Sequence, residues 1–313
     1  MADKIATREA YGNALAALGE KYTDFVVLDA DLAAATKTGT FKKKFPERFF
    51  DCGIAEGNMV GVAAGLAAAG KTVFASSFAM FAAGRAFEQI RNSVGYPKLN
   101  VKIGATHAGI SVGEDGATHQ CNEDIALMRT IPGMTIVNPA DETEAAAAVE
   151  AAITTYGPFY LRFGRAAVPT VCPEGYKFEL GKGVMLREGA DVTIVATGLM
   201  VHLALEAAET LAAEGISAEV INIHTIKPLD KDIIAASAAK TGAVVTAEEH
   251  SVIGGLGGAV CEALAEACPV PVVRVGVEDR FGMSGKVPEL LEEYGLTAAN
   301  IVANAKKAIS LKK

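Results

Sequence analysis

The feature that most constrains this chain is a regular alternation between short β-rich apolar runs and alanine-rich helical runs, which continues along its whole length. The strand-like runs occupy residues 24–30, 72–77, 100–106, 134–140, 159–163, 191–198, 218–223, 242–248 and 271–277. Runs that are apolar on both faces and separated by helices are typical of parallel sheets covered on both sides. We therefore predict an α/β fold made of two doubly wound domains with mostly parallel sheets.

The alternation breaks once, between Arg165 and Val184. The segment AAVPTVCPEGYKFELGKG contains prolines and glycines and has no helical period. A chain of 313 residues is long enough for about two domains, each with its own core. We expect a first domain over 1–168, a linker over 169–184 and a second domain over 185–313.

The charge balance limits the classes of partner. Lys and Arg total 29 against 37 Asp and Glu, and a net charge of -8 argues against nucleic acid and against an anionic membrane. The start, MADKIATREAYG, carries charges where a secretory signal needs an apolar run, and the longest apolar stretch, 60–70, is too short to span a bilayer. The five cysteines form no C-x-x-C pair. We expect a cytoplasmic protein with reduced structural thiols.

Two glycine-rich stretches imitate nucleotide-binding loops. GLAAAGKT, 65–72, matches the phosphate-loop pattern, but a helix precedes it and a strand follows it, which reverses the order that the mechanism requires. SVIGGLGGAVCEAL, 251–264, has Val260 in place of the third glycine of a dinucleotide fingerprint, and no ribose-binding acid follows in PVVRVGV. We interpret the glycines of this second stretch as helix packing onto a sheet.

Glu56 stands at the start of an expected helix in which glycine recurs every four residues, at Gly57, Gly61 and Gly65. A helix dipole favours glutamate there, and a smooth face suits helix packing, so a purely structural reading is open. Glycines inside a helix cost about 1 kcal/mol each relative to alanine. We therefore expect another surface, a second subunit being a good candidate, to press against this face.

Two further stretches carry possible site residues. The first, 74–92, places three aromatic residues on one face of an expected helix, a stripe that core packing alone would explain: Phe74, Phe78 and Phe81. The second is the glycine-rich loop GISVGEDGATHQCNEDIA, 109–126, which gathers Glu114, Asp115 and His119 close after His107. The acids of this loop could equally be turn residues.

Taken in order, these residues resemble the pyrimidine-binding half of transketolase, a thiamine diphosphate enzyme that moves two-carbon ketol units between sugar phosphates. The resemblance runs from Arg8 to about Pro169 and continues more weakly through IKPLD and EEHSVIGGLGGAV. It rests on the motifs ATRE, DADL, CGIAEGNMVG, SSFAMFAAGRAFEQIR, THAGISVGEDGATHQ and NPADE.

The resemblance implies roles for the cofactor side of the site. Glu56 matches the glutamate that bonds to the pyrimidine ring nitrogen and drives the cofactor's tautomerisation. Phe78 and Phe81 match the aromatic wall on which the pyrimidine stacks, and Asp31 matches an acid near the cofactor.

The same resemblance implies roles for the substrate side. His107 and His119 match groups that exchange protons with sugar hydroxyls, and Asp115 matches the acceptor that reads the configuration of a hydroxyl. Arg8 and Arg165 match the pair that holds the substrate phosphate, a task for which bidentate arginine is apt. A phosphate-binding serine of the family is replaced, since Ala35 or Thr36 stands in its place.

The diphosphate side of the site has no counterpart in this sequence. Family members hold the diphosphate through Mg²⁺ with Gly-Asp-Gly followed by Asn, on a separate domain. The nearest approach here is Glu114-Asp115-Gly116, and the five histidines are too far apart for a local ligand set, so we expect no metal site on this chain. The resemblance therefore implies one subunit of a split transketolase, whose N-terminal partner carries the diphosphate-binding domain and the Mg²⁺ ligands.

In this interpretation the chain also associates with a second copy across a twofold interface, giving a heterotetramer, and acts on sugar phosphates of the pentose phosphate pathway. Three alternatives remain open at this stage. Deoxyxylulose-phosphate synthase and the β subunit of a 2-oxo-acid dehydrogenase share the glutamate and the fold. A non-catalytic binding subunit that kept the fold and lost the chemistry is the third.

Overall fold

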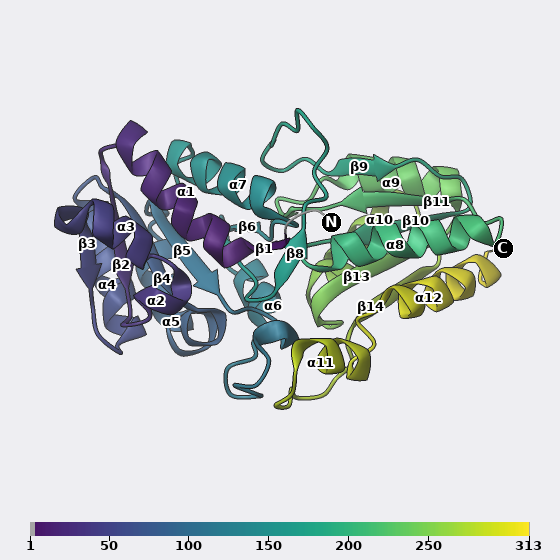
Figure 1. Cartoon of the computed structure of the whole chain (residues 1–313). Coiled ribbons are helices and arrows are strands. Elements are labelled where there is room, and N and C mark those ends of the chain that lie inside the picture. The colour runs from purple at the N-terminus through teal and green to yellow at the C-terminus, as the bar shows by residue number, and fades with distance from the viewer. Residues whose placement is uncertain (1–3, 313) are drawn as a thin grey trace.

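Two open sheets with helices on both faces organise residues 4–312, which are the residues that the computed structural model describes (Figure 1). The first sheet has seven strands in the order β12-β6-β7-β5-β4-β2-β3, and the second has five in the order β14-β13-β10-β11-β9. All neighbours are parallel except β12 beside β6 and β9 beside β11. A small antiparallel pair, β1 and β8, lies between the sheets.

The strands are β1 Lys4–Ala6, β2 Phe25–Asp29, β3 Phe49–Asp51, β4 Thr72–Phe78, β5 Val101–Thr106, β6 Thr135–Val137, β7 Phe159–Arg162, β8 Ala167–Pro169, β9 Val184–Arg187, β10 Val192–Ala196, β11 Ala218–Asn222, β12 Thr225–Lys227, β13 Val244–Ser251 and β14 Val272–Val277. The α-helices are α1 Thr7–Lys21, α2 Ala33–Thr36, α3 Gly39–Lys44, α4 Glu56–Ala68, α5 Phe87–Gln89, α6 Asp124–Arg129, α7 Glu142–Thr154, α8 Met200–Ala213, α9 Lys231–Thr241, α10 Leu256–Ala267, α11 Val287–Glu293 and α12 Ala298–Ser310. Short 3₁₀ turns are η1 Pro46–Arg48 and η4 Ile110–Val112, and π-helical turns are η2 Met80–Arg85 and η3 Ile90–Gly95.

The predicted strand runs are found in the structure, and aspartate side chains cap two of the helix starts. At the start of α7, the Asp141 side chain accepts a hydrogen bond from the Glu144 N–H at 2.9 Å, and the Glu144 carboxylate accepts one from the Ala140 N–H at 2.7 Å. The first bond satisfies an N–H group that a helix start leaves without an intrahelical partner, and the second fixes the residue before the cap. At the start of α9, Asp230 accepts a hydrogen bond from the Ile233 N–H.

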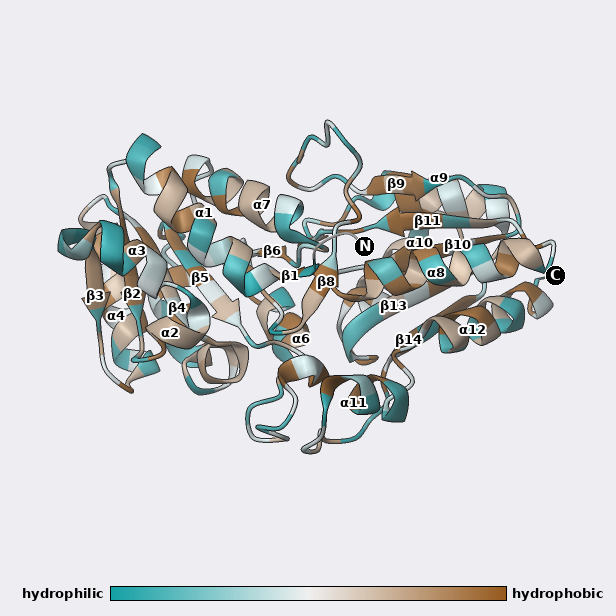
Figure 2. Cartoon of the chain, in the orientation of Figure 1, coloured by the Kyte–Doolittle hydropathy of each residue, from teal (hydrophilic) through white to brown (hydrophobic). Residues whose placement is uncertain are grey.

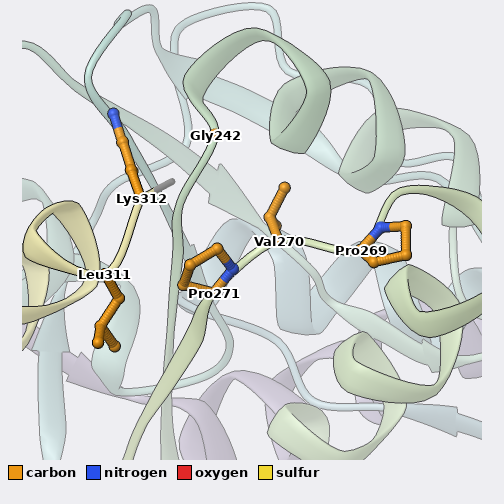
Figure 3. A pocket seen from close by; sticks show the side chains of 6 residues that line it. All are labelled: Gly242, Pro269, Val270, Pro271, Leu311 and Lys312. Atoms are coloured by element: carbon orange, nitrogen blue, oxygen red, sulfur yellow. The ribbon is translucent and has the colours of Figure 1, made fainter.

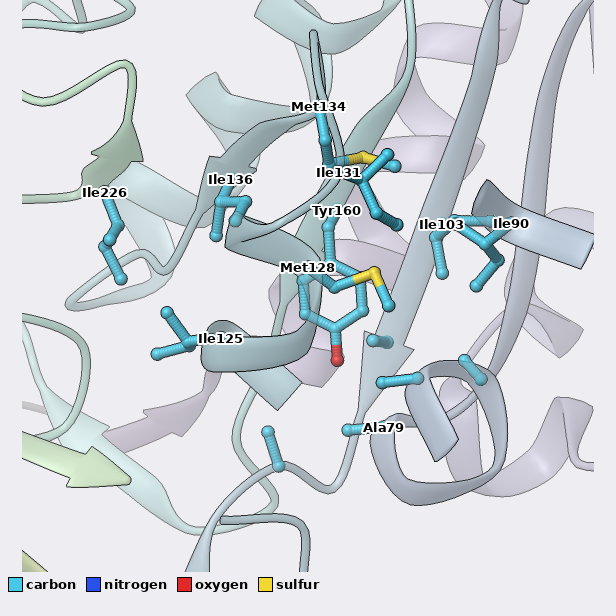
Figure 4. Packing of buried hydrophobic residues seen from close by; sticks show 14 of the residues in the cluster. Ala79, Ile90, Ile103, Ile125, Met128, Ile131, Met134, Ile136, Tyr160 and Ile226 are labelled. Carbon is cyan, nitrogen blue, oxygen red and sulfur yellow. The ribbon is translucent and has the colours of Figure 1, made fainter. Parts of the chain in front are cut away.

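The two sheets share apolar packing. Strand β12 comes from the second half of the chain, yet it pairs with β6 of the first sheet, where Thr225 lies opposite Val137. One core cluster continues across this junction, and Figure 4 shows Ile226 of β12 near Ile136 of β6 and Ile125 of α6. In Figure 2 most strands inside the domains are hydrophobic, whereas the helices outside them carry both hydrophobic and hydrophilic residues. Strand β12 thus joins the β6 side of the first sheet to the second half of the chain.

The prediction that Phe74, Phe78 and Phe81 share one helical face is wrong. Phe74 and Phe78 belong to strand β4, and only Phe81 lies in the helical segment that follows. Phe74 packs in the core beside Tyr11 and Phe25, with ring centroids 6.4 and 5.5 Å away. A run as apolar as FASSFAMF fits both periods, so its pattern alone does not distinguish strand from helix.

Both glycine-rich stretches take the structures that argue against nucleotide loops. Helix α4 ends at Ala68 and strand β4 begins at Thr72, so the phosphate-loop order is reversed, as predicted. At the second stretch, the Leu256 and Gly257 N–H groups at the start of α10 donate to the Glu248 carboxylate at 2.6 and 2.8 Å. The amides that would bind a phosphate are therefore occupied by a side chain of the protein itself.

Within residues 4–312, no helix is long and apolar enough to cross a membrane.

Candidate active site

The candidate residues gather at one edge of the first sheet. In a parallel sheet the carboxyl ends of the strands meet at the same edge, where ligands of α/β proteins usually bind. The residues at or just beyond these ends are Asp29 and Asp31 after β2, Glu56 after β3, Phe78 at the end of β4, His107 after β5 and Arg165 after β7. Arg8 lies in the first turn of α1, and its contact with His107 places its side chain at the same edge.

Glu56 is the first residue of α4, and its side chain is only 1% exposed. One carboxylate oxygen accepts a hydrogen bond from Arg85 Nη1 at 2.8 Å, and Ser77 Oγ lies 3.4 Å from the other. The Arg85 side chain is 57% exposed. The buried carboxylate thus has one oxygen paired with a solvent-facing side chain, which a ligand can replace.

Two phenylalanines and two histidines form an aromatic wall beside this carboxylate. The rings of Phe78 and Phe81 stack with centroids 5.8 Å apart. His107 stacks on Phe78 at 3.8 Å, and the His119 ring meets Phe81 edge-on at 5.2 Å. The Arg85 guanidinium lies 5.0 Å from the Phe81 ring centre. The wall therefore links the residues expected on the cofactor side with those expected on the sugar side.

His107 is neutral, with a defined tautomer. Arg8 Nη1 lies 3.0 Å from its Nε2, and because arginine can only donate, Nε2 accepts. The proton therefore sits on Nδ1, 2.9 Å from Thr106 Oγ1. Burial lowers the pKa of His107 to about 3, with further contributions from the positive charges of Arg8 and Arg165. In this arrangement both ring nitrogens are engaged, so Nε2 becomes available to a ligand only when Arg8 moves.

Arg8 and Arg165 concentrate positive charge in an otherwise acidic protein. Burial, and then the like charge of Arg165, lower the pKa of Arg8. Arg165 Nη1 donates to the Val112 carbonyl at 2.6 Å and lies 3.3 Å from a Glu114 carboxylate oxygen. Two neighbouring guanidinium groups favour an anion, and the Glu114 carboxylate that pairs with Arg165 is 63% exposed. The structure thus brings together the two arginines expected to hold the substrate phosphate.

Neither residue at the place of the missing family serine offers a hydroxyl to that anion. Ala35 contributes its carbonyl, which accepts from Arg8 Nη1 at 3.0 Å. The Thr36 hydroxyl is buried and donates to Asp29 Oδ2 at 2.7 Å.

The loop after His107 carries the remaining sugar-side candidates. Asp115 is exposed, and within residues 4–312 no hydrogen bond or ion pair engages its carboxylate. His119 is partly buried, and its Nδ1 lies 3.0 Å from Thr118 Oγ1. Among the described residues, no hydrogen bond engages the Nε2 of His119, which leaves that nitrogen available to a ligand.

Sequence reasoning missed two residues of this site. Asp29, two residues before the predicted Asp31, is fully buried and accepts hydrogen bonds from Thr36 and Thr38, and burial raises its pKa to about 6. Asp31 is exposed, with a left-handed φ of 62°, and its N–H donates to Asp51 Oδ1 at 3.1 Å. The DAD pattern at a strand end could have indicated Asp29. Arg85, the partner of Glu56, carries no such signal.

Two family models match the chain. The transketolase pyrimidine binding domain matches residues 3–170, and the transketolase C-terminal domain matches residues 181–301. The chain belongs to the transketolase family. The predicted fold class, with two mostly parallel α/β domains, is therefore confirmed for this transketolase family member, as is the resemblance on which the expected roles depend.

Comparisons with individual proteins also point to the transketolase family. The chain is 53% identical to a putative transketolase C-terminal section of Methanocaldococcus jannaschii, over 94% of this chain and 93% of that protein. It is 49% identical to a 6-deoxy-6-sulfo-D-fructose transketolase subunit of Clostridium sp., over 95% and 92% of the two chains. A split-gene transketolase solved as an inactive beta4 tetramer superposes with a TM-score of 0.91 at 56% identity, covering 99% of this chain and 100% of the other.

Other features lie outside this site. Within residues 4–312, no group of three or more His, Cys, Asp or Glu side chains could hold a metal ion. The hollow in Figure 3, with a volume of about 540 Å³, lies at the amino ends of β13 and β14 beside the end of α12. Its lining is mostly apolar and includes Pro269, Val270, Pro271 and Leu311. It belongs to the opposite end of the molecule from the candidate residues (Figure 1).

Proposed function

We propose that this chain is one subunit of a thiamine diphosphate-dependent transketolase, which transfers a two-carbon ketol unit from a ketose phosphate to an aldose phosphate. The observation that carries the proposal is the convergence of a buried carboxylate, an aromatic wall and two guanidinium groups at one sheet edge. Each matches a different part of the reactants: pyrimidine ring, flat apolar surface and anionic substrate end.

The residues on this chain fit the pyrimidine end of the cofactor. A carboxylate that is 1% exposed costs free energy unless it is paired, and the exposed Arg85 is its closest charged partner. A ring nitrogen that binds a proton would take the same oxygen, while Phe78 and Phe81 provide the flat surface. When bound, thiamine diphosphate supplies the carbon that accepts and releases the ketol unit.

Each of these side chains has its own role toward the cofactor or the sugar. Glu56 holds a proton at the pyrimidine ring nitrogen and so maintains the reactive tautomer. His119 offers its Nε2 to a sugar hydroxyl, and Asp115 accepts a hydrogen bond from a further hydroxyl. His107 is a neutral imidazole whose Nε2 binds a hydroxyl once Arg8 turns toward the anionic end of the sugar.

Arg8 and Arg165 bind the anionic end of the sugar. The guanidinium fork suits phosphate, and it equally suits a sulfonate, the group on the sugar that names the Clostridium relative. In this proposal the two arginines recognise the terminal anion of the sugar. The two histidines and Asp115 bind its hydroxyl groups.

The other half of the cofactor site belongs, in this proposal, to an N-terminal partner subunit that carries the diphosphate-binding domain and the Mg²⁺ ligands. The relatives support it, because two of them are a C-terminal section and a split-gene product that matches this chain in length. We also propose that the enzyme is a heterotetramer. The cytoplasm suits it, because the five cysteines are free.

The outer face of α4 supports contact with a second copy. Gly61 and Gly65 are exposed, and a Cβ atom added at either would meet nothing within 4 Å in this chain. Packing inside the chain therefore gives no reason for these glycines. Val62 beside them is 40% exposed, and Ile54 in the loop before α4 is 79% exposed. A smooth apolar face of this kind is suited to a twofold interface.

The test is Glu56→Gln in the reconstituted enzyme, because a neutral amide cannot drive the tautomer. We expect an unchanged fold and the loss of most turnover. Glu150→Gln is the matched control, since Glu150 pairs with Lys21 on the surface, outside the site. Turnover of Glu56→Gln within about threefold of wild type, under about 1 kcal/mol of activation free energy, would remove Glu56 from the cofactor site.

A further inference from the structure

The loop that carries Asp115 and His119 lies directly on the second domain. Figure 1 shows this loop beside α11, and its 3₁₀ turn η4 packs against that helix. Gly109 has a left-handed φ of 78°, and a Cβ atom there would collide with the Glu249 carboxylate of β13. A Cβ atom at Gly116, where φ is 73°, would come within 3.3 Å of the Ser284 nitrogen. The glycines thus permit close contact between the domains.

Glu249 is the centre of this contact. Its side chain is 3% exposed, and Oε1 accepts a hydrogen bond from the Ser111 N–H at 2.6 Å. The Glu249 main-chain carbonyl accepts a bond from Arg162 Nη2 at 2.9 Å. Arg162 is in turn fixed by the buried Asp124, at 2.8 Å from Nε. A buried carboxylate that bonds a backbone N–H is a strong, short tether, and Ser111 lies only four residues before Asp115.

Two weaker tethers act on the same loop. Ser284 Oγ donates to the Glu114 carbonyl at 2.6 Å. The Gln120 amide donates to the Met283 carbonyl at 2.9 Å and to the Ile110 carbonyl at 3.1 Å. The loop is therefore held at its beginning, middle and end, in each case with help from the second domain.

We propose that Glu249 is a positioning residue, through which the second domain sets the place of the loop 109–120 and hence the affinity for the sugar. The proposal rests on the proposed function, since it takes Asp115 and His119 as sugar-binding groups. It gives the second domain, which supplies none of the expected site residues, a defined part in substrate recognition. Burial raises the pKa of Glu249, and the nearby Arg162 of the first domain opposes that shift.

The experiment uses Glu249→Met, which keeps the length of the side chain and removes the acceptor, in the enzyme reconstituted with its partner subunit. Glu249→Gln is the rescue variant, because its carbonyl oxygen can still accept from Ser111. Glu248→Gln is the control, since that neighbouring buried carboxylate bonds α10 and not the loop. The readouts are hydrogen exchange of the 109–120 peptide, KM for each sugar, kcat and the Kd of thiamine diphosphate.

We expect Glu249→Met to speed exchange in the 109–120 peptide and to raise the sugar KM by about tenfold, with the cofactor Kd unchanged within about twofold. Glu249→Gln should restore both values, and Glu248→Gln should alter neither. Ser284→Ala, at an exposed position, should produce the same changes on a smaller scale, and it remains informative if Glu249→Met does not fold.

Three results would overturn the proposal. The first is unchanged exchange of the peptide in Glu249→Met and Ser284→Ala. The second is faster exchange with an unaltered sugar KM. The third is an equal loss of sugar and cofactor binding, which would indicate general damage. Absence of ketol transfer by the wild-type enzyme would instead reject the proposed function, and the role in sugar affinity with it, while the exchange data would still report the tether.

Discussion

Removing the imidazole of His107 should make the protein's stability less sensitive to acid. The side chain is 3% exposed, and burial together with Arg8 and Arg165 lowers its pKa to about 3 from an ordinary value of 6.5. Between these two values the unfolded chain binds a proton at this residue and the folded chain does not. The contribution of His107 to the free energy of unfolding is therefore retained above pH 6.5 and lost as the pH falls below it.

The size of the effect follows from the two pKa values. A pH of 5 is about 1.5 units below the pKa of the histidine in the unfolded chain, which is therefore mostly protonated. The folded residue is still neutral at this pH. Each unit corresponds to about 1.4 kcal/mol, so the loss at pH 5 is about 2 kcal/mol relative to pH 8. In His107→Gln this loss is absent, because glutamine does not titrate. Its amide oxygen can still accept from Arg8, which limits the structural damage.

The assay is urea unfolding of the wild type and His107→Gln at pH 8, 7, 6 and 5. We expect the wild-type free energy of unfolding minus that of the variant to fall by about 2 kcal/mol between pH 8 and pH 5. The comparison cancels the opposite contributions of Glu144 and Glu248, whose raised pKa values of about 7 are present in both proteins. A difference that changes by less than about 0.5 kcal/mol would refute a buried, neutral His107.

Further variants test the anion site and the interface. Arg165→Ala should raise KM for phosphorylated sugars more than for their unphosphorylated analogues, because it removes one of two guanidinium groups; equal effects in steady-state kinetics would exclude Arg165 from the anion site. Gly61→Leu should weaken subunit association, measured by analytical ultracentrifugation, more than it lowers the Tm of the single chain. The control is Ala212→Leu, at an exposed position on α8, and equal weakening by both variants would contradict a specific interface on α4.

Local signals account for the part of the fold that the sequence predicts. Each strand run is apolar over several residues, and the start of α7 depends on two side chains three residues apart, Asp141 and Glu144. Strand β12 escapes prediction because three residues are too short to show a period, and its partner β6 lies about 90 residues earlier. The apolar surroundings of Phe78 suit a helix as well as a strand, so the sequence pattern does not place it in β4.

The candidate site likewise contains residues that the sequence predicts and contacts that it does not. Residues next to a strand end or a helix start, such as Glu56 and His107, can be proposed from the sequence, because the chain direction places them at one sheet edge. The hydrogen-bond partners that fix such side chains cannot be proposed in this way. The tautomer of His107 is set by Arg8, 99 residues away, and the contact of Glu249 with Ser111 spans 138 residues. The fold of the first domain brings Arg8 to His107, and the packing of the two domains brings Glu249 to Ser111.

The measurement that tests the central claim most directly is ketol transfer by the purified chain, with excess thiamine diphosphate and Mg²⁺, in the absence and presence of the partner subunit. We predict no transfer by the chain alone, because the proposed function places the ligands of the diphosphate and of Mg²⁺ on the partner. Addition of the partner should produce transfer that requires both cofactors. Robust cofactor-dependent transfer by the chain alone would contradict the account.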